Sequence, residues 1–248
     1  MTELVVAMGL IVGLAAAHEV GFWIGSLTRS TDEPFDRQVA LVRTSTSALV
    51  AFLVGFAFSG AASRFVDRND IVVREANALG TAYLRADAVA EPQRGELKAA
   101  LKEYTADRIV LLSREGRDRI DPLLAKVSGL HERMWRSAIT ATQDNAPLMQ
   151  VILPPINDVI DLHSVHLATA RRHLPVPIMA LLLGTAALSL GLVGFGNGRV
   201  GRRFSGLDSV YAVVLAIALW MTIDLDYPGI GLIRVSNLPI VETLAAMK

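Results

Sequence analysis

The sequence predicts an all-α integral membrane protein, with four transmembrane helices and a helical soluble domain inserted between the second and the third. Three observations favour this class. Hydrophobic residues make up 52% of the 248 residues, and the mean hydropathy of +0.42 is high for a water-soluble domain. These residues are concentrated in long uncharged stretches. The polar region between them repeats its apolar residues at helical spacing and does not alternate as a strand does.

Four apolar stretches account for the membrane spans. A span needs about 20 residues, because the hydrocarbon core is about 30 Å thick and a helix rises about 1.5 Å per residue. The second stretch is bounded by Arg43 and Arg64, and the shorter fourth stretch lies between Asp208 and Asp224. The chain starts with Met-Thr-Glu, without the positive charge of a signal peptide, so we expect the first stretch to be a retained span. The predicted spans cover residues 4–27, 44–63, 174–195 and 209–223.

The polar region between the second and third spans is expected to form a helical bundle. Asp121 and Pro122 are a helix-start signal, because the aspartate caps a helix and the proline fits its first turn. Apolar residues recur at helical spacing after residue 96 and again after residue 122. We therefore divide the chain into residues 1–66 with the first two transmembrane helices, residues 67–173 with the soluble domain, and residues 174–248 with the last two transmembrane helices and a C-terminal segment.

One face of the second transmembrane helix carries a distinctive stripe of side chains. No proline separates this span from the charged residues after it, so one helix is expected to continue from the membrane into the soluble domain. At 100° per residue, hydroxyl groups flank two phenylalanines on one face, and charged residues continue the same face. The stripe consists of Ser45, Ala48, Phe52, Phe56, Ser59 and Ser63 in the span, followed by Asp70, Arg74 and Asn77.

The stripe allows two interpretations. In the first, serine and glycine let membrane helices pack closely, and Phe52 and Phe56 are core residues. In the second, several copies of the helix surround a symmetry axis, and the phenylalanines form a narrow apolar ring that gates ion flow by dewetting. Polar residues would then line the wider ends of the pore, and the positive edges of the aromatic rings would favour anions.

Three motifs resemble known membrane proteins. The segment FLVGFAFSGAASRFVDR, residues 52–68, resembles the second membrane helix of bestrophins through Phe52, the Gly55-Phe56 pair and the Arg64-Phe65 pair. VVREANALGTAYLRAD, residues 72–87, and DLDYPGIGLIRVS, residues 224–236, are similar to a bacterial bestrophin-like family. This second resemblance spans essentially the whole chain.

The resemblance implies a homo-oligomeric ion channel, pentameric and mostly anion-selective, in a bacterial inner membrane. Chloride is then the candidate ion, although the stripe carries both signs of charge. The resemblance assigns the pore neck to Phe52 and Phe56, with a third position at Ala48 whose small side chain leaves that level wide. Phe65 and Val66 stand where bestrophins usually have two tryptophans, and no acidic cluster of the calcium-clasp kind is present.

The orientation of the soluble domain has two conflicting indications. The arginines of the two short connections favour placing that domain outside the cell, by the positive-inside rule. The resemblance implies a cytosolic domain. We follow the resemblance and expect a cytosolic soluble domain.

Charged residues gather where the second and fourth spans meet the soluble domain. Carboxylates at a membrane boundary are costly unless they are paired, and arginine offers a bidentate partner. We therefore predict that Asp224 or Asp226 pairs with Arg64, Arg68 or Arg234, within or between subunits. The alternative is an interfacial helix end without such a pair.

His18 and Glu19 lie within the first predicted span. Ionisable residues at membrane depth are functional candidates, and a histidine can titrate near neutral pH. They lie about 21 to 23 Å along the helix from Leu4, so an interfacial position is an equal alternative. A coupled transporter using these two residues is less favoured, because four spans leave little room for alternating access.

No motif indicates catalysis, a cofactor, a metal or a nucleic-acid partner. The glycine-rich GFGNGRVG, residues 194–201, follows a membrane span instead of a strand, so we expect a flexible connection there. His163 and His166 could hold a metal with Asp161, but we expect them on the polar face of a soluble helix. The net charge is zero, which gives no indication of a nucleic-acid partner. Cysteine is absent, which excludes disulfides and thiolate sites. The expected partners are the lipid bilayer, monovalent inorganic ions and further copies of the chain.

Two functions follow from these observations. The first is a bestrophin-like channel whose residues 44–66 line an apolar neck. The second is a non-conducting membrane anchor, structural or regulatory, whose helical domain binds a partner. We expect no enzymatic activity in either case.

Overall fold

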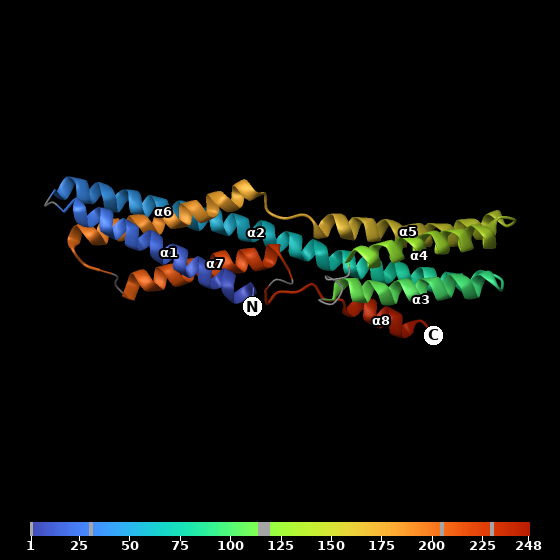
Figure 1. Cartoon of the computed structure of the whole chain (residues 1–248). Helices are drawn as coiled ribbons and strands as arrows, with labels where there is room; N and C mark the ends of the chain where they lie inside the picture. Colours follow the sequence, from blue (N-terminus) through green and yellow to red (C-terminus); the bar gives the residue numbers. More distant parts are fainter. Residues whose placement is uncertain (1, 30–31, 114–119, 204–205, 229–230) are drawn as a thin grey trace. The chain divides into compact units, whose positions relative to one another are not determined.

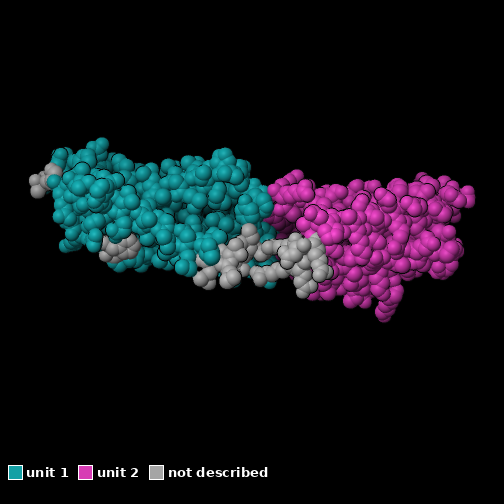
Figure 2. Space-filling view, viewed as in Figure 1, with its two compact units in different colours: residues 1–65, 173–234 teal, residues 66–172, 235–248 magenta. Residues whose placement is uncertain are grey.

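The computed structural model describes residues 2–29, 32–113, 120–203, 206–228 and 231–248, with side chains from residue 5 onward. Within these residues every element is a helix, which confirms the all-α class. The chain forms two compact units, coloured separately in Figure 2. We name residues 1–65 with 173–234 the membrane unit, and residues 66–172 with 235–248 the bundle unit. The C-terminal residues 235–248 thus belong with the bundle, whereas the sequence grouped them with the last two spans.

Four long helices build the membrane unit (Figure 1). All four are long and apolar enough to cross a membrane, which confirms the four predicted spans. Each helix is longer than the apolar stretch that predicted it, because the helix continues into charged residues beyond that stretch. The helices are α1 (Thr2–Leu27), α2 (Glu33–Arg85), α6 (Val176–Val200) and α7 (Gly206–Asp226).

Helix α2 is one uninterrupted helix of 53 residues that contributes to both units. Its single proline, Pro34, lies in the first turn, where the missing amide proton costs no hydrogen bond. Glu33 and Asp36 also lie in that turn, where negative charge suits the helix dipole. With no later proline, the backbone hydrogen bonds continue through the change from apolar to charged residues.

The core of the membrane unit lies on the face of α2 opposite the phenylalanine stripe. Val50, Val54, Ala57 and Ala61 are buried there. Their apolar neighbours come mainly from α6 and α7 and include Leu182, Ala186, Leu190, Leu215 and Leu219. This face of α2 therefore packs on neighbouring helices of the same chain.

Helices α1 and α6 approach each other through glycines. A Cβ at Gly194 would lie 2.0 Å from the carbonyl oxygen of His18, and a Cβ at Gly21 would lie 1.9 Å from that of Gly191. No side chain fits such gaps, so glycine is required for this close backbone contact. Residues 194–200 are helical in α6, so the expected flexible connection at GFGNGRVG is wrong. Its glycines serve helix packing.

Gly194→Ala is expected to destabilise the protein by about 1–3 kcal/mol, because the new methyl group clashes with the backbone of α1. Gly184→Ala, on the same helix, is the matched control, because a Cβ there meets nothing within 4 Å. That control is expected to be neutral or slightly stabilising. Thermal unfolding in detergent compares the two variants, and equal midpoints would contradict the close packing.

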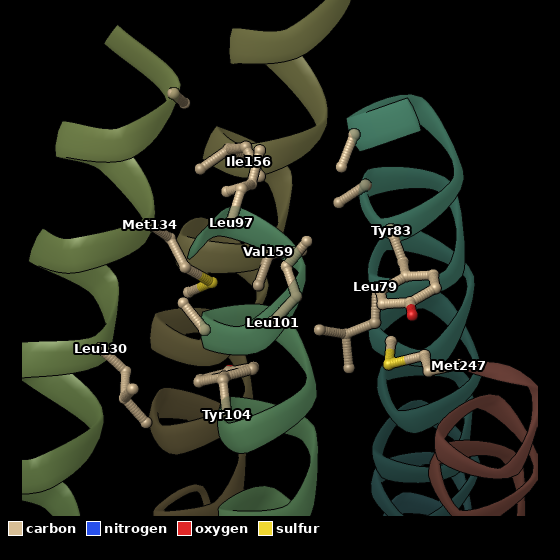
Figure 3. Packing of buried hydrophobic residues seen from close by; sticks show 14 of the residues in the cluster. Leu79, Tyr83, Leu97, Leu101, Tyr104, Leu130, Met134, Ile156, Val159 and Met247 are labelled. Atoms are coloured by element: carbon tan, nitrogen blue, oxygen red, sulfur yellow. The ribbon is translucent and has the colours of Figure 1, made fainter. Parts of the chain in front are cut away.

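The bundle unit consists of the second part of α2 with α3 (Gln93–Leu112), α4 (Ile120–Thr142), α5 (Ala146–Ala170), α8 (Leu238–Ala246) and the short 3₁₀ helix η1 (Ala86–Ala88). The side chain of Asn145 caps α5 by accepting a 3.0 Å hydrogen bond from the Leu148 amide. Figure 3 shows the core, in which Leu79 of α2 and Leu101 of α3 are fully buried. Ile240 and Met247 join the same core, which explains why the C-terminal residues belong to this unit.

Candidate functional site

The phenylalanine stripe of α2 has no cover from the described part of the chain. Phe52 and Phe56 are 69% and 72% exposed, although both lie in an apolar span. The remaining members of the stripe are also exposed: Ser45, Ala48, Ser59, Ser63, Asp70, Arg74 and Asn77. Phe52 and Phe56 are therefore not core residues of the described chain. Among the described residues, none covers this face.

The soluble part of the stripe borders a groove in the bundle unit. Arg74, Asn77 and Thr81 of α2 face Asp158 and Asp161 of α5 across a cavity of about 520 Å³. Arg85, near the end of α2, donates a 3.1 Å hydrogen bond to the carbonyl oxygen of Val151 and ties the two helices together. The polar end of the stripe thus has a second wall, which α5 supplies.

An ion pair connects α2 with the end of α7. Arg64 Nε lies 2.8 Å from Oδ1 of Asp226, whose side chain is fully buried. The Leu174 amide donates to the other oxygen of the same carboxylate at 2.8 Å. His173 approaches the carbonyl oxygen of Asp226 at 2.9 Å and stacks on the ring of Tyr227. Asp226 therefore joins three segments: α2, the start of α6 and the end of α7.

The other predicted boundary charges are placed differently. Asp224 is buried and accepts hydrogen bonds from the amides of Leu232 and Ile233, at 3.0 and 3.1 Å. Among the described residues, neither Asp224 nor Arg234 forms an ion pair, and Gly229 and Ile230 of the motif lie outside those residues. Arg68, in the bundle unit, donates to the carbonyl oxygen of Arg172 at 2.6 Å. Of the five predicted charges, Arg64 and Asp226 form the described ion pair.

His18 and Glu19 do not form a common site. His18 is fully buried, and its Nε2 lies 3.4 Å from the side-chain nitrogen Nδ2 of Asn197. Asn197 donates a 2.7 Å hydrogen bond to Asp208, so the polar neighbours of His18 come from α6 and α7. Glu19 is exposed on another face of α1. Asn197 is not among the residues predicted for a site, because the sequence predicts a connection at residues 194–201.

A second polar site, also missed, is buried in the bundle unit. Glu75 of α2 forms a bidentate ion pair with Arg108 of α3, and both side chains are almost completely buried. The Tyr104 hydroxyl donates to Glu75 at 3.1 Å, and His166 Nδ1 lies 3.2 Å from the same carboxylate. The ring of His163 packs edge-on against that of His131, with centroids 5.0 Å apart. We name these six residues the histidine cluster.

The histidine cluster corrects the expectation that His163 and His166 lie on a polar outer face. His163 is buried, and His166 contacts a buried carboxylate. Asp161 instead accepts a hydrogen bond from Asn157 on the outside of α5. The described residues contain no group of three or more side chains placed to hold a metal ion.

Stability of the bundle unit is expected to fall at acid pH, because His163 is held neutral in the folded protein. Burial lowers the pKa of His163 to about 4, with Arg108 and His131 acting in the same direction. Its stabilising contribution is complete above the unfolded pKa of about 6.5 and is lost as the pH falls toward 4. The loss amounts to about 3 kcal/mol. From pH 7.5 to pH 4.5 the unfolding midpoint of the natural protein should fall further than that of His163→Leu, and equal falls would contradict the assignment.

The helices and the uncovered stripe define the chain as an α-helical, four-span membrane protein. It belongs to the bestrophin-like family, since the family model described as Bestrophin-like domain matches residues 12–240. The fold is similar to the crystal structure of a mutant bacterial bestrophin homolog from Klebsiella pneumoniae, with a TM-score of 0.64. That match has 13% sequence identity and covers 99% of this chain and 93% of the other. No functionally curated protein matches the chain.

Proposed function

We propose that the chain is the subunit of a homo-oligomeric ion channel whose pore is lined by the stripe of α2. The observation that carries this proposal is the uncovered state of Phe52 and Phe56 within a face that is exposed from Ser45 to Asn77. The opposite face of the same helix is packed, so α2 is fixed in the unit with its stripe outward. Membership of the bestrophin-like family supports the same function.

The neck of this pore would be formed by the two phenylalanines. They lie about 6 Å apart along the helix axis, one turn from each other, so copies around an axis would present two stacked apolar rings. Water leaves a narrow apolar constriction readily, and ions then meet a barrier. Ala48 would leave the third level wide, and hydroxyl groups would line the approach on both sides. This arrangement makes Phe52 and Phe56 the determinants of conductance.

A single copy of α2 cannot enclose a pore, so the function requires self-association. We propose a pentamer, as the resemblance to bestrophins implies. The same resemblance and the positive edges of the phenylalanine rings favour chloride as the permeant ion. The bacterial inner membrane is the proposed location, with the bundle unit in the cytosol.

The test uses protein purified in detergent. Its mass should be a multiple of the 26.7 kDa chain, and the same sample should conduct in a planar bilayer under a potassium chloride gradient. Reversal near the chloride equilibrium potential supports the proposal in full, and reversal near the potassium potential supports the channel with opposite selectivity. An intact oligomer that is silent at all voltages would overturn the channel and favour the non-conducting anchor.

A further inference from the structure

The proposed pore helix has a buried ionic contact on the side away from the stripe. Glu75 follows Arg74 directly, and one residue turns a helix by about 100°. Arg74 therefore borders the open groove, while Glu75 points into the bundle and pairs with Arg108. The hydroxyl of Tyr104 and the ring of His166 complete the contacts of its carboxylate. This network fixes the bundle part of α2 to α3 and α5.

Two imidazole nitrogens beside this network lack hydrogen bonds. His131 Nε2 and His163 Nδ1 are buried without a partner in the part of the chain that the structure describes. The rings of Tyr104, His131 and His163 pack together, with centroid distances of 5.1, 6.1 and 5.0 Å. Buried polar atoms normally have a hydrogen-bond partner, so a buried nitrogen without one calls for an explanation. Each ring, when neutral, keeps one nitrogen lone pair that can take a proton.

The charged groups around these rings disfavour a protonated histidine beside the positive Arg108. Helix α2 contributes Glu75, α3 contributes Arg108 and Tyr104, α4 contributes His131, and α5 contributes His163 and His166. Met247 of the C-terminal segment contacts Thr105 of α3 and brings no charge. The one carboxylate is already shared by Arg108, Tyr104 and His166. Burial and Arg108 lower the pKa of both His131 and His163, so a proton on either ring repels the guanidinium.

We propose that the histidine cluster is an acid-sensitive contact that holds the bundle part of α2 in place, so that protonation of His131 and His163 closes the pore. The inference rests on the proposed function. Protonated rings compete with Arg108 for Glu75, and the ion pair that positions α2 is weakened. The segment carrying Asp70, Arg74 and Asn77 then loses its fixed position beside the pore. Two packed arrangements of α2, selected by proton binding, are the general form of such switches.

The experiment measures open probability and mean current in planar bilayers while the pH is lowered from 7.5 to 3.5, below the pKa of His163 at about 4. The test variant is the double substitution His131→Phe and His163→Leu, which keeps apolar packing and removes both titrating rings. Met134→Leu is the control, because Met134 is buried in the same core and carries no proton. We expect the current of the natural protein and of the control to fall several-fold at acid pH. The current of the double variant should stay constant.

A current that is constant in the natural protein, or that falls equally in the double variant, would overturn the proposal. Hydrogen exchange in α3, α4 and α5 provides a readout that needs no conduction. At pH 3.5, the natural protein should exchange these amides several-fold faster than the double variant, after correction for intrinsic rates. If the protein conducts at no pH, the proposed function fails by itself. Equal exchange in the two proteins would then remove the acid-sensitive contact as well.

Discussion

Replacing Phe52 and Phe56 together with alanine is expected to raise the single-channel conductance several-fold. The two rings would form the narrowest apolar part of the pore, and their removal would let water and ions fill it. The stability cost should be small, because both side chains are about 70% exposed and their loss leaves no cavity inside the subunit. Conductance in planar bilayers and unfolding midpoints in detergent measure the two effects separately.

Leu188→Ala is the matched control for the phenylalanines. Leu188 is an exposed apolar residue of α6, a different spanning helix, and 56% of its surface is accessible. Its removal should leave conductance unchanged. An unchanged conductance in the phenylalanine variant, together with a lower midpoint or a lost oligomer, would show that these rings pack between subunits without lining a pore.

Asp226→Ala is expected to destabilise the protein by about 3–5 kcal/mol, because it breaks an ion pair whose carboxylate is fully buried. The change removes the partner of the partly exposed Arg64 and the buried acceptor of the Leu174 amide. Asp226→Asn should recover part of the loss, because the amide oxygen still accepts a hydrogen bond. Thermal unfolding in detergent, followed by loss of oligomer, provides the measurement.

Glu19→Ala is the control for the loss of a carboxylate. Glu19 is exposed on α1, so its removal should change stability by less than about 0.5 kcal/mol. The two substitutions remove the same charge from the membrane unit and differ in burial and pairing. Equal midpoints for Asp226→Ala and Glu19→Ala would contradict a stabilising ion pair at the boundary.

Features that depend on one helix could be predicted from the sequence. The four spans follow from apolar length alone, and the stripe from Ser45 to Asn77 follows from 100° rotation along a helix without an interior proline. The pairing of an arginine with an aspartate at the boundary follows from the cost of an isolated charge near lipid. Each of these features depends on local spacing or on a single energetic rule.

Features that depend on contacts between distant segments could not be predicted. Glu75 gave no signal in the sequence, because its partners Arg108 and His166 lie on other helices. Gly194 has the sequence context of a loop, and only its close contact with the backbone of α1 explains the glycine. The sequence does not show which of the two aspartates pairs with Arg64. Asp224 accepts hydrogen bonds from backbone amides eight and nine residues later, and Asp226 forms the ion pair.

Cysteine modification during current recording tests the central claim most directly, since the chain has no cysteine and every introduced thiol is unique. Ser59→Cys places a thiol on the stripe beside the proposed neck, and Leu188→Cys places one on an exposed face of α6. A water-soluble, charged thiol reagent should block most of the current through Ser59→Cys and leave the Leu188→Cys current unchanged. If neither current responds to the reagent, or if both respond equally, the stripe of α2 does not line the path of the ions.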